Sequence, residues 1–328
     1  MLHRLWQRRA AIGAGAALAL GLSLAGCGQS AAPAGGKTLT IGFVPGMTTD
    51  PFFISMQAGA EAEAHKLGVK LLWEGASQYS PSQQTPYVDS LVARGVSALI
   101  VAPTDAQAMI PPIRQAVDPH IPVITVDSTI NDHALLKSRI TSNNVGGGEQ
   151  AAAILARQIG YHGTVAILSP APGITTDAAR IQGFVAQIRK YPHIRYVGIE
   201  YDQEQNTKAA TLAQDLVLHH PHLAGIFATD DTSASGAASG LRTAGKAGTV
   251  KIVAYDAEPA EVQGLENGSI SALIAQKPAI EGQLAVEYAY DLLTGKAKAV
   301  RPFVELQNVV LDRANLAANR QWEYRTTP

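Results

Sequence analysis

The chain has 328 residues, of which 46% are hydrophobic and 16% are charged, and its formal net charge is −1. This composition is typical of a globular protein long enough for two domains, not of a disordered chain. The sequence contains no basic patch and no basic run interleaved with aromatic residues, so we expect no nucleic-acid partner.

The beginning of the chain is predicted to be an export signal. Basic residues precede an apolar run from Ala10 to Leu24, which is too short to span a bilayer with margin and has the form of a secretory leader. The run ends in LAGC at 24–27, which resembles a bacterial lipobox. In that family the leader is cleaved before the cysteine, whose thiol is lipidated. The resemblance implies a signal peptide at 1–26 and a lipid anchor on Cys27; the alternative is a chance run of small residues before a free cysteine.

Cys27 is the only cysteine, so we expect no disulfide in the exported protein and stability from its core alone. The small, polar stretch GQSAAPAGGK that follows predicts a flexible tether, so 27–37 is interpreted as the lipidated cysteine and its tether. The pair Arg8-Arg9 leaves the export route open between the general and twin-arginine pathways.

The first half of the remaining chain alternates apolar runs with helical patterns. Strands are predicted at 39–44, 69–74, 98–103 and 122–127, and helices at 52–67, 83–94 and 106–117. Strands joined by single helices indicate parallel βαβ units. The strands are continuous Val/Ile/Leu runs, which is expected when helices cover both faces of a sheet.

A second series of the same kind follows. Its strands are predicted at 164–170, 194–201, 224–230, 251–257 and 270–276, and its helices at about 146–160, 177–190, 206–219, 232–244 and 258–267. A last helix at about 279–294 precedes a late strand at 303–311. Gly245, Gly268 and Gly295 stand where helix C-caps are expected. No Pro/Ser-rich linker separates the halves, so we expect the chain to cross between them through short strands.

Polar side chains collect at the carboxyl ends of the predicted strands, where open α/β sheets bind ligands. The residues at these positions are Asp50, Asp127, Ser128, Asp230, Asp231, Asp256 and Gln276, together with Arg180 in the first turn of a helix. Helix capping is the alternative role for Asp50, for Asp230 or Asp231, and for Asp256. As a group, these carboxylate, amide and guanidinium side chains suit a ligand with many hydroxyl groups. The faces of Phe52 and Phe53 suit the C–H surface of a sugar ring.

Several stretches carry a resemblance to a known family. In chain order they are IGFVPGMTTDPFFISMQAGAEAEAHKLG, VARGVSALIVAPTDAQA, IPVITVDS, AARIQGF, IFATDDTSASGA, IVAYDAEP and ALIAQKP. The pattern resembles the periplasmic ribose-binding protein family, the type I sugar-binding subunits of ABC importers, over almost all of 38–311. Its most specific parts are DPFF, the strand end VITVD and the AQ before Pro278.

The resemblance implies the α/β fold of the type I periplasmic binding proteins. Two Rossmann-like, doubly wound lobes are joined by a three-strand hinge and close around one ligand. The lobe boundaries implied are 38–142 plus 277–305 for the N-terminal lobe and 143–276 plus 306–316 for the C-terminal lobe, with 317–328 as a C-terminal tail.

The resemblance also implies the ligand contacts. The positions matching the family's contacts are Asp50, Phe52, Phe53, Asp127, Ser128, Arg180, Glu204, Asp230, Asp256 and Gln276. Four of them depart from the ribose binders: Asp50 and Asp230 stand in place of Asn, Ser128 in place of Arg, and Glu204 in place of a stacking Phe. The site loses a cation and an aromatic face and gains carboxylates. We therefore expect a ligand other than ribose: an acyclic polyol, another pentose or tetrose, or an amino-bearing sugar.

The motifs of enzymes and metal proteins match poorly. The stretch GLRTAGKA at 240–247 echoes a phosphate-binding loop, but it ends in Ala247 and closes a helix. The start of a calcium loop at Asp202 lacks the glycine and glutamate that follow in such loops. The histidines of 219–222 lie in a predicted turn and are interpreted as solvent-facing rather than metal-binding. We expect no catalysis, no cofactor and no metal.

The leading hypothesis is a monomeric, lipid-anchored solute-binding protein in the periplasm or on the outer face of the cell membrane. It would deliver a small polyhydroxy compound to an ABC permease and its ATPase. A sensory receptor on the same fold, serving a chemoreceptor or binding an autoinducer, is the alternative. A transcriptional repressor is disfavoured by the lipobox and by the lack of a helix-turn-helix before residue 38, and an enzyme by the motifs above.

Overall fold

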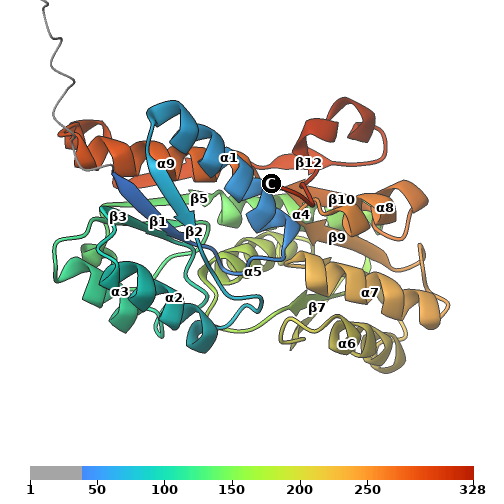
Figure 1. Cartoon of the computed structure of the whole chain (residues 1–328). Helices are drawn as coiled ribbons and strands as arrows, with labels where there is room; N and C mark the ends of the chain where they lie inside the picture. The colour runs from blue at the N-terminus through green and yellow to red at the C-terminus, as the bar shows by residue number, and fades with distance from the viewer. Residues whose placement is uncertain (1–38) are drawn as a thin grey trace, which may run out of the picture. The chain divides into compact units, whose positions relative to one another are not determined.

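The computed structural model describes residues 39–328, which form two mostly parallel sheets (Figure 1). The predicted leader, the anchor on Cys27 and the tether lie outside the described residues. Within 39–328, no helix is long and apolar enough to cross a membrane.

The first sheet has six strands, all paired in parallel. Their order is β11 (Phe303–Leu306), β5 (Ser138–Ser142), β4 (Val123–Val126), β3 (Ala98–Val101), β1 (Thr40–Val44) and β2 (Lys70–Trp73). Helices α1 (Pro51–Leu67) and α9 (Pro278–Leu293) pack together on one face, and α2 (Pro81–Ala93) and α3 (Ile110–Val117) on the other. We call this sheet and its helices the first lobe.

The second sheet also has six strands and repeats the arrangement. Their order is β12 (Val309–Leu311), β10 (Ala272–Ala275), β9 (Lys251–Tyr255), β8 (Leu223–Ala228), β6 (Gly163–Ser169) and β7 (Ile194–Tyr201), with only the β12–β10 pair antiparallel. Helices α4 (Asn144–Gln158) and α5 (Thr175–Ile188) pack together, as do α6 (Asn206–His219) and α7 (Asp231–Thr243), with α8 (Pro259–Asn267) beside α7. This is the second lobe.

The apolar strands explain the layers. In β3 and β4 every residue is buried, because helices cover both faces of the sheet. The helix ends also follow the sequence: Gly245, Gly268 and Gly295 all have positive φ where α7, α8 and α9 end. The predicted helix at 106–117 begins later, at Ile110, because Asp105 Oδ1 accepts hydrogen bonds from the backbone N–H groups of Gln107 and Ala108 and forms a turn.

The observed strands differ from the prediction in two places. The strand predicted at 303–311 is two strands, β11 in the first sheet and β12 in the second, because the chain leaves one sheet for the other between them. The sequence analysis also missed β5, whose residues SRITS are mostly polar. This strand is held by its neighbours β4 and β11 rather than by a continuous apolar run.

The chain passes three times between the lobes: between β5 and α4, between β10 and α9, and between β11 and β12. Near the first crossing, the run GGG at 146–148 allows α4 to approach α5 closely. A Cβ on Gly148 would lie 1.9 Å from the carbonyl oxygen of Arg180. Only glycine permits this contact, which brings the backbone of α4 against the helix that carries Arg180.

Candidate ligand-binding site

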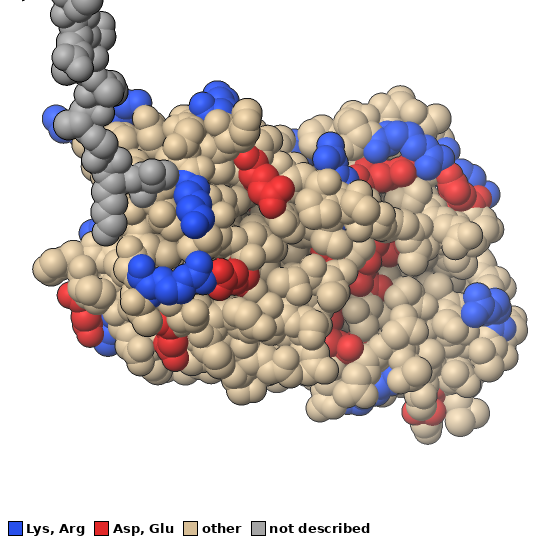
Figure 2. Space-filling view, viewed as in Figure 1, with Lys and Arg blue, Asp and Glu red and all other residues tan. Residues whose placement is uncertain are grey.

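The loops at the carboxyl ends of both sheets enclose a cavity of about 50 Å³ between the lobes. The cavity is lined by nine of the ten residues predicted from the sequence, namely Asp50, Phe52, Phe53, Asp127, Arg180, Glu204, Asp230, Asp256 and Gln276. In Figure 2, acidic side chains are visible within a hollow of the surface near the starts of α1 and α7. Parallel strands of each sheet end at the same edge, so these residues from distant parts of the sequence meet.

Ser128 is the predicted residue that does not line this cavity. Its hydroxyl donates a hydrogen bond of 2.7 Å to the carbonyl oxygen of Pro103, and the side chain is buried. It lines instead a neighbouring cavity of about 210 Å³, together with Arg139 and Phe303. A serine is too short to replace the reach of the arginine that ribose binders are expected to carry here.

Asp50 both caps helix α1 and lines the cavity. Its Oδ1 accepts a hydrogen bond of 2.6 Å from the backbone N–H of Phe52, so Asp50 is the N-cap, and Pro51 occupies the first helical position. The same turn directs Phe52 and Phe53 to the cavity. Their rings meet edge to face with centroids 5.0 Å apart, and both are buried. Capping was the alternative to a place in the ligand site for Asp50, and the structure shows that Asp50 caps the helix and lines the cavity as well.

Among residues 39–328, Arg180 is the one basic residue that lines the cavity. Its Nε donates to Asn144 Oδ1 at 2.9 Å and its Nη1 to the carbonyl oxygen of Thr229 at 2.6 Å. The guanidinium carbon lies 3.8 Å from the centroid of the Tyr255 ring, a cation–π geometry. These contacts hold the guanidinium in place while its Nη1 stays 3.9 Å from Asp256 Oδ2.

Asp256 and Gln276 form a hydrogen-bonded pair at the ends of β9 and β10. Asp256 Oδ1 accepts from Gln276 Nε2 at 2.6 Å and from the Tyr324 hydroxyl at 3.0 Å. The Tyr324 hydroxyl in turn accepts a 2.9 Å bond from the backbone N–H of Gln276. These three hydrogen bonds do not use Asp256 Oδ2 or Gln276 Oε1, so both oxygens can accept hydrogen bonds from other groups.

Three cavity residues have left-handed backbone conformations. The φ angles are +61° at Asp127, +56° at Glu204 and +81° at Asp256. Such conformations cost of order 1 kcal/mol or more for residues with a side chain and often occur where a functional side chain must be aimed. At Asp127 and Asp256 the strand has just ended, and the turn directs each carboxylate into the cavity.

Several cavity residues were not among the ten ligand contacts predicted from the sequence, although Asp231 was noted there at a strand end. Met47, Tyr79, Ile174, Thr176, Asp177 and Asp231 also line the cavity. Asp231 had a signal, since it follows Asp230 at a strand end, and Asp177 lies one helical turn before Arg180. Tyr79 and Ile174 come from loops that no pattern marks.

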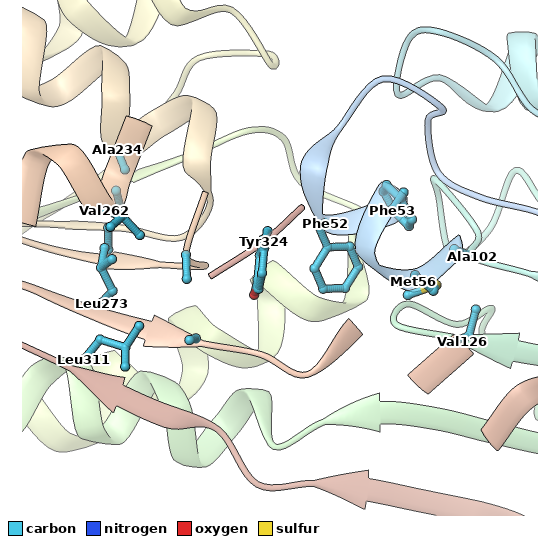
Figure 3. Packing of buried hydrophobic residues seen from close by; sticks show 14 of the residues in the cluster. Phe52, Phe53, Met56, Ala102, Val126, Ala234, Val262, Leu273, Leu311 and Tyr324 are labelled. Atoms are coloured by element: carbon cyan, nitrogen blue, oxygen red, sulfur yellow. The ribbon is translucent and has the colours of Figure 1, made fainter. Parts of the chain in front are cut away.

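The segment 317–328, predicted as a tail, reaches the site through Tyr324, which is 5% exposed. Figure 3 shows the ring of Tyr324 beside that of Phe52, and the centroids are 5.7 Å apart. The backbone N–H of Tyr324 donates to Ala257 in the second lobe, and that of Arg325 donates to Ser55 Oγ in the first lobe. This segment therefore contacts both lobes next to the cavity.

The cavity is strongly acidic: seven carboxylates and one arginine line it. Burial raises the pKa of Asp50 to about 6, that of Asp127 to about 7 and that of Asp231 to about 8. Burial and the neighbouring carboxylates raise the pKa of Glu204 and of Asp230 well above the ordinary value. For Arg180, burial by itself would lower the pKa, but Asp256 and Asp177 more than offset it and raise the pKa.

A group of three carboxylates offers the best candidate cation ligands among the described residues. Oxygens of Asp50, Asp231 and Glu258 all lie within 4.8 Å of one another. Burial, followed by the charges of Asp231 and Asp50, raises the pKa of Glu258 to about 12. Carboxylates this close require a shared proton or a cation between them.

The chain matches a known family over most of its length. Residues 41–297 match the model of the periplasmic binding protein domain. The ribose import binding protein of Bacillus subtilis (strain 168) is 33% identical over 79% of this chain and 83% of its own length. A solute-binding protein of an ABC transporter from Agrobacterium vitis, solved with α-D-tagatopyranose, is 35% identical, covers 88% of this chain and 100% of its own, and superposes with a TM-score of 0.85. The xylitol-binding protein of Mycolicibacterium smegmatis is 25% identical over 92% of this chain and 86% of its own length.

The two facing α/β lobes and these matches define a two-lobed binding protein with its ligand cavity between the sheets. The chain belongs to the periplasmic binding protein domain family and is a solute-binding protein of the ribose-binding type. The predicted family, the predicted fold and the predicted role as a sugar importer's solute-binding protein are confirmed.

Proposed function

We propose that this protein captures one small sugar or polyol in the cavity between its lobes and delivers it to an ABC permease and its ATPase. The observation that carries the proposal is the cavity lining itself. Carboxylates, Gln276 and Arg180 offer hydrogen bonds to several hydroxyl groups, and Phe52 and Phe53 supply aromatic surface. A ligand that lacks one hydroxyl would leave a buried acceptor unpaired, which gives the site its specificity.

The ten predicted residues are proposed as follows. Asp50, Phe52, Phe53, Asp127, Arg180, Glu204, Asp230, Asp256 and Gln276 contact the ligand, and Ser128 supports the loop that carries Asp127. Arg180, Asp256 and Gln276 are already held by hydrogen bonds to protein groups, so they are positioned before a ligand arrives.

Ribose is not the preferred ligand in this proposal. When ionised, the carboxylates of Asp50, Glu204 and Asp230 accept hydrogen bonds only, whereas amides also donate. The site therefore favours a ligand rich in donors. The named ligands of similar proteins, α-D-tagatopyranose and xylitol, show that relatives of this chain take ligands other than ribose.

The mechanism is closure of the two lobes about the three crossings. We assign 38–142 plus 277–305 to the first lobe and 143–276 plus 306–316 to the second, with 317–328 packed against both. A ligand that bridges the lobes stabilises the closed form, and this form is the one that the permease recognises. The protein acts as a monomer and catalyses no reaction, in keeping with a family of binding proteins.

We propose an extracytoplasmic location with a lipid anchor at the membrane. The family is extracytoplasmic, and the LAGC sequence at 24–27 is proposed to place a lipid on Cys27 that anchors the protein to the membrane. Labelling with a radioactive fatty acid in the producing cell tests this step. Incorporation that is lost in Cys27→Ala supports the anchor, and equal incorporation in both contradicts it.

A thermal-shift screen of aldoses, ketoses and polyols on the purified protein tests the ligand class. We expect at least one compound other than ribose to raise Tm by several degrees, and Arg180→Met to abolish the rise. Stabilisation by ribose alone would refute the ligand class proposed here, and no response to any sugar or polyol would refute the proposed function.

A further inference from the structure

The carboxylates of the cavity divide into those that have a basic partner and those that have none. Arg180 Nη1 lies 3.8 Å from Asp177 Oδ1 and 3.9 Å from Asp256 Oδ2. Within residues 39–328, no lysine, arginine or histidine nitrogen lies within 4 Å of a carboxylate of Asp50, Glu204, Asp230 or Asp231. The charged neighbours that dominate at Glu204 and Asp230 are other carboxylates. One part of the cavity thus lacks a countercharge.

Buried acceptors in the cavity also lack hydrogen-bond donors. Asp230 Oδ2 and Gln276 Oε1 have no hydrogen-bond partner, although their side chains are only 8% and 2% exposed. Asp230 Oδ1, by contrast, accepts from the backbone N–H of Ser233 at 3.0 Å and caps α7. A buried acceptor without a donor is costly, and these atoms line the cavity, so the ligand must supply the donors.

A neutral hydroxyl group can supply a donor but no countercharge. At Asp50, Asp231 and Glu258, three carboxylates lie within 4.8 Å of one another, and hydroxyl groups leave their mutual repulsion in place. A protonated amine carries three donors and a positive charge on one atom, which matches three converging carboxylates. Its hydrogen bonds to ionised acceptors are also stronger than those of a neutral donor.

A bound divalent cation fits less well. Calcium takes six to eight oxygen ligands, and magnesium needs octahedral geometry. Asp50, Asp231 and Glu258 supply one close group of three, whereas Asp230 and Glu204 add their charge at other points of the lining. Arg180 lines the same cavity, and because its guanidinium only donates hydrogen bonds, the ligand must also present acceptor oxygens. Hydroxyl groups together with one amine satisfy both requirements.

Resting on the function proposed above, we infer that the natural ligand is a polyhydroxy compound bearing a protonated amine, an amino sugar or amino polyol. The ammonium group lies against Asp50, Asp231 and Glu258, with the unpaired Oδ2 of Asp230 as a further acceptor in the lining. The hydroxyl groups meet Arg180, Asp256 and Gln276. Binding of the amine replaces the protons that hold the clustered carboxylates neutral, so it releases protons to the solvent.

Matched pairs of compounds test this inference by isothermal titration calorimetry on the purified full-length protein. The probes are glucosamine, galactosamine and mannosamine, each compared with its neutral sugar and its N-acetyl derivative, and the 1-amino-1-deoxy derivatives of xylitol and glucitol, each compared with its alditol. Phosphate and HEPES buffers at pH 7 are used, because Tris is itself an amino polyol. We expect at least one amine to bind at least about tenfold more tightly than its neutral counterpart. The heat of binding should differ between the buffers by the amount that proton release requires.

Substitutions test whether the carboxylates without a basic partner cause the preference for amines over neutral compounds. In Asp231→Asn and Asp230→Asn, the ratio of amine to neutral affinity should fall at least about fivefold. An asparagine at position 230 can still cap α7, and Asp231 is not the cap. Glu61→Gln, on the exposed face of α1, removes one carboxylate outside the cavity and should leave the ratio unchanged.

Each other outcome overturns the inference in a distinct way. Neutral compounds that bind as tightly as their amines refute the amine and leave the proposed function standing. Failure of all compounds to bind refutes both. Binding of a neutral compound that needs added calcium and is abolished by EDTA shows that a metal ion supplies the countercharge, and also refutes the amine.

Discussion

At the scale of single residues, Arg180 is the best-anchored group in the site. It is 3% exposed and donates to Asn144 and Thr229, while Asp177 and Asp256 lie just beyond hydrogen-bond distance. A buried charge in such a network is costly to remove, because its partners remain buried without a countercharge.

We therefore predict that Arg180→Met lowers the free energy of unfolding by about 3 kcal/mol or more and weakens ligand binding at least tenfold. Urea denaturation and calorimetry measure the two effects. Arg114→Met is the matched control, since the Arg114–Asp132 pair at 2.7 Å is largely solvent-exposed and should contribute less than about 1 kcal/mol. Equal losses in the two variants would contradict the role given to Arg180.

Asp50 illustrates how one residue can serve both helix and ligand. Asn can cap α1 as Asp does, so Asp50→Asn should change the free energy of unfolding by less than about 1 kcal/mol, whereas Asp50→Ala should cost about 1 kcal/mol through loss of the bond to Phe52 N–H. Both variants should change the ranking of ligands in the thermal-shift screen. If the ranking and the affinities stay the same in Asp50→Asn, Asp50 is only a helix cap.

At the scale of elements, the C-terminal segment contributes more than its sequence suggests. The family resemblance implies a tail at 317–328, yet Tyr324 contacts Asp256 and Gln276 of the second lobe and the Phe52 ring of the first. The late strand at 303–311 presents a similar case, since its apolar run continues across the point where the chain changes sheets. The structure of these two segments depends on contacts with residues far away in the chain, which a local sequence pattern cannot show.

We predict that Tyr324→Phe lowers the free energy of unfolding by about 1–3 kcal/mol, because the buried N–H of Gln276 and one oxygen of Asp256 lose a partner. Ligand affinity should fall as well, since Asp256 is less firmly held. Tyr290→Phe is the control: it removes a hydroxyl from a partly exposed tyrosine of α9 and should change stability by less than about 0.5 kcal/mol. If Tyr324→Phe changes stability and ligand affinity no more than Tyr290→Phe does, the Tyr324 hydroxyl does not hold Asp256 and Gln276 in place.

At the scale of the whole molecule, the acidic cavity couples stability to pH. The pKa values of Asp50, Asp127 and Asp231 are raised to about 6, 7 and 8 in the folded protein, above the ordinary value of an aspartate. Between the unfolded and the folded pKa, the folded protein binds more protons than the unfolded chain, so the free energy of unfolding falls as pH rises. The stabilisation is present in full below the unfolded aspartate pKa of about 4, and it is lost as pH rises through about 6, 7 and 8 at the three residues.

We predict that Tm of the protein without added ligand is lower at pH 8 than at pH 5 by at least about 4 °C, as measured by differential scanning calorimetry. The slope should be shallower in Asp231→Asn, which removes the aspartate whose pKa is raised to about 8. A Tm that rises between pH 5 and pH 8 would show that these carboxylates are not held protonated in the folded state.

Closure is the second property of the whole molecule. The three crossings connect the lobes covalently, whereas between the loops the lobes are held by hydrogen bonds such as that from the backbone N–H of Thr129 to Thr175 Oγ1. A ligand that contacts both lobes should therefore favour a more compact form. Small-angle scattering with the tightest ligand of the screen should show a smaller radius of gyration. An unchanged radius at saturation would contradict the closure mechanism.

The pattern of residues was enough to predict two α/β lobes, because buried parallel strands must be apolar throughout and helices must show a helical period. It was also enough to predict which strand ends carry the polar residues that line the cavity, since parallel strands end at one edge. Only the tertiary structure brought Tyr79, Asp177 and Tyr324 to the site, moved Ser128 away from it, and divided the last strand between two sheets. These features depend on contacts between segments far apart in the chain, and so does the separation of the acids into those that Arg180 neutralises and those left for a ligand.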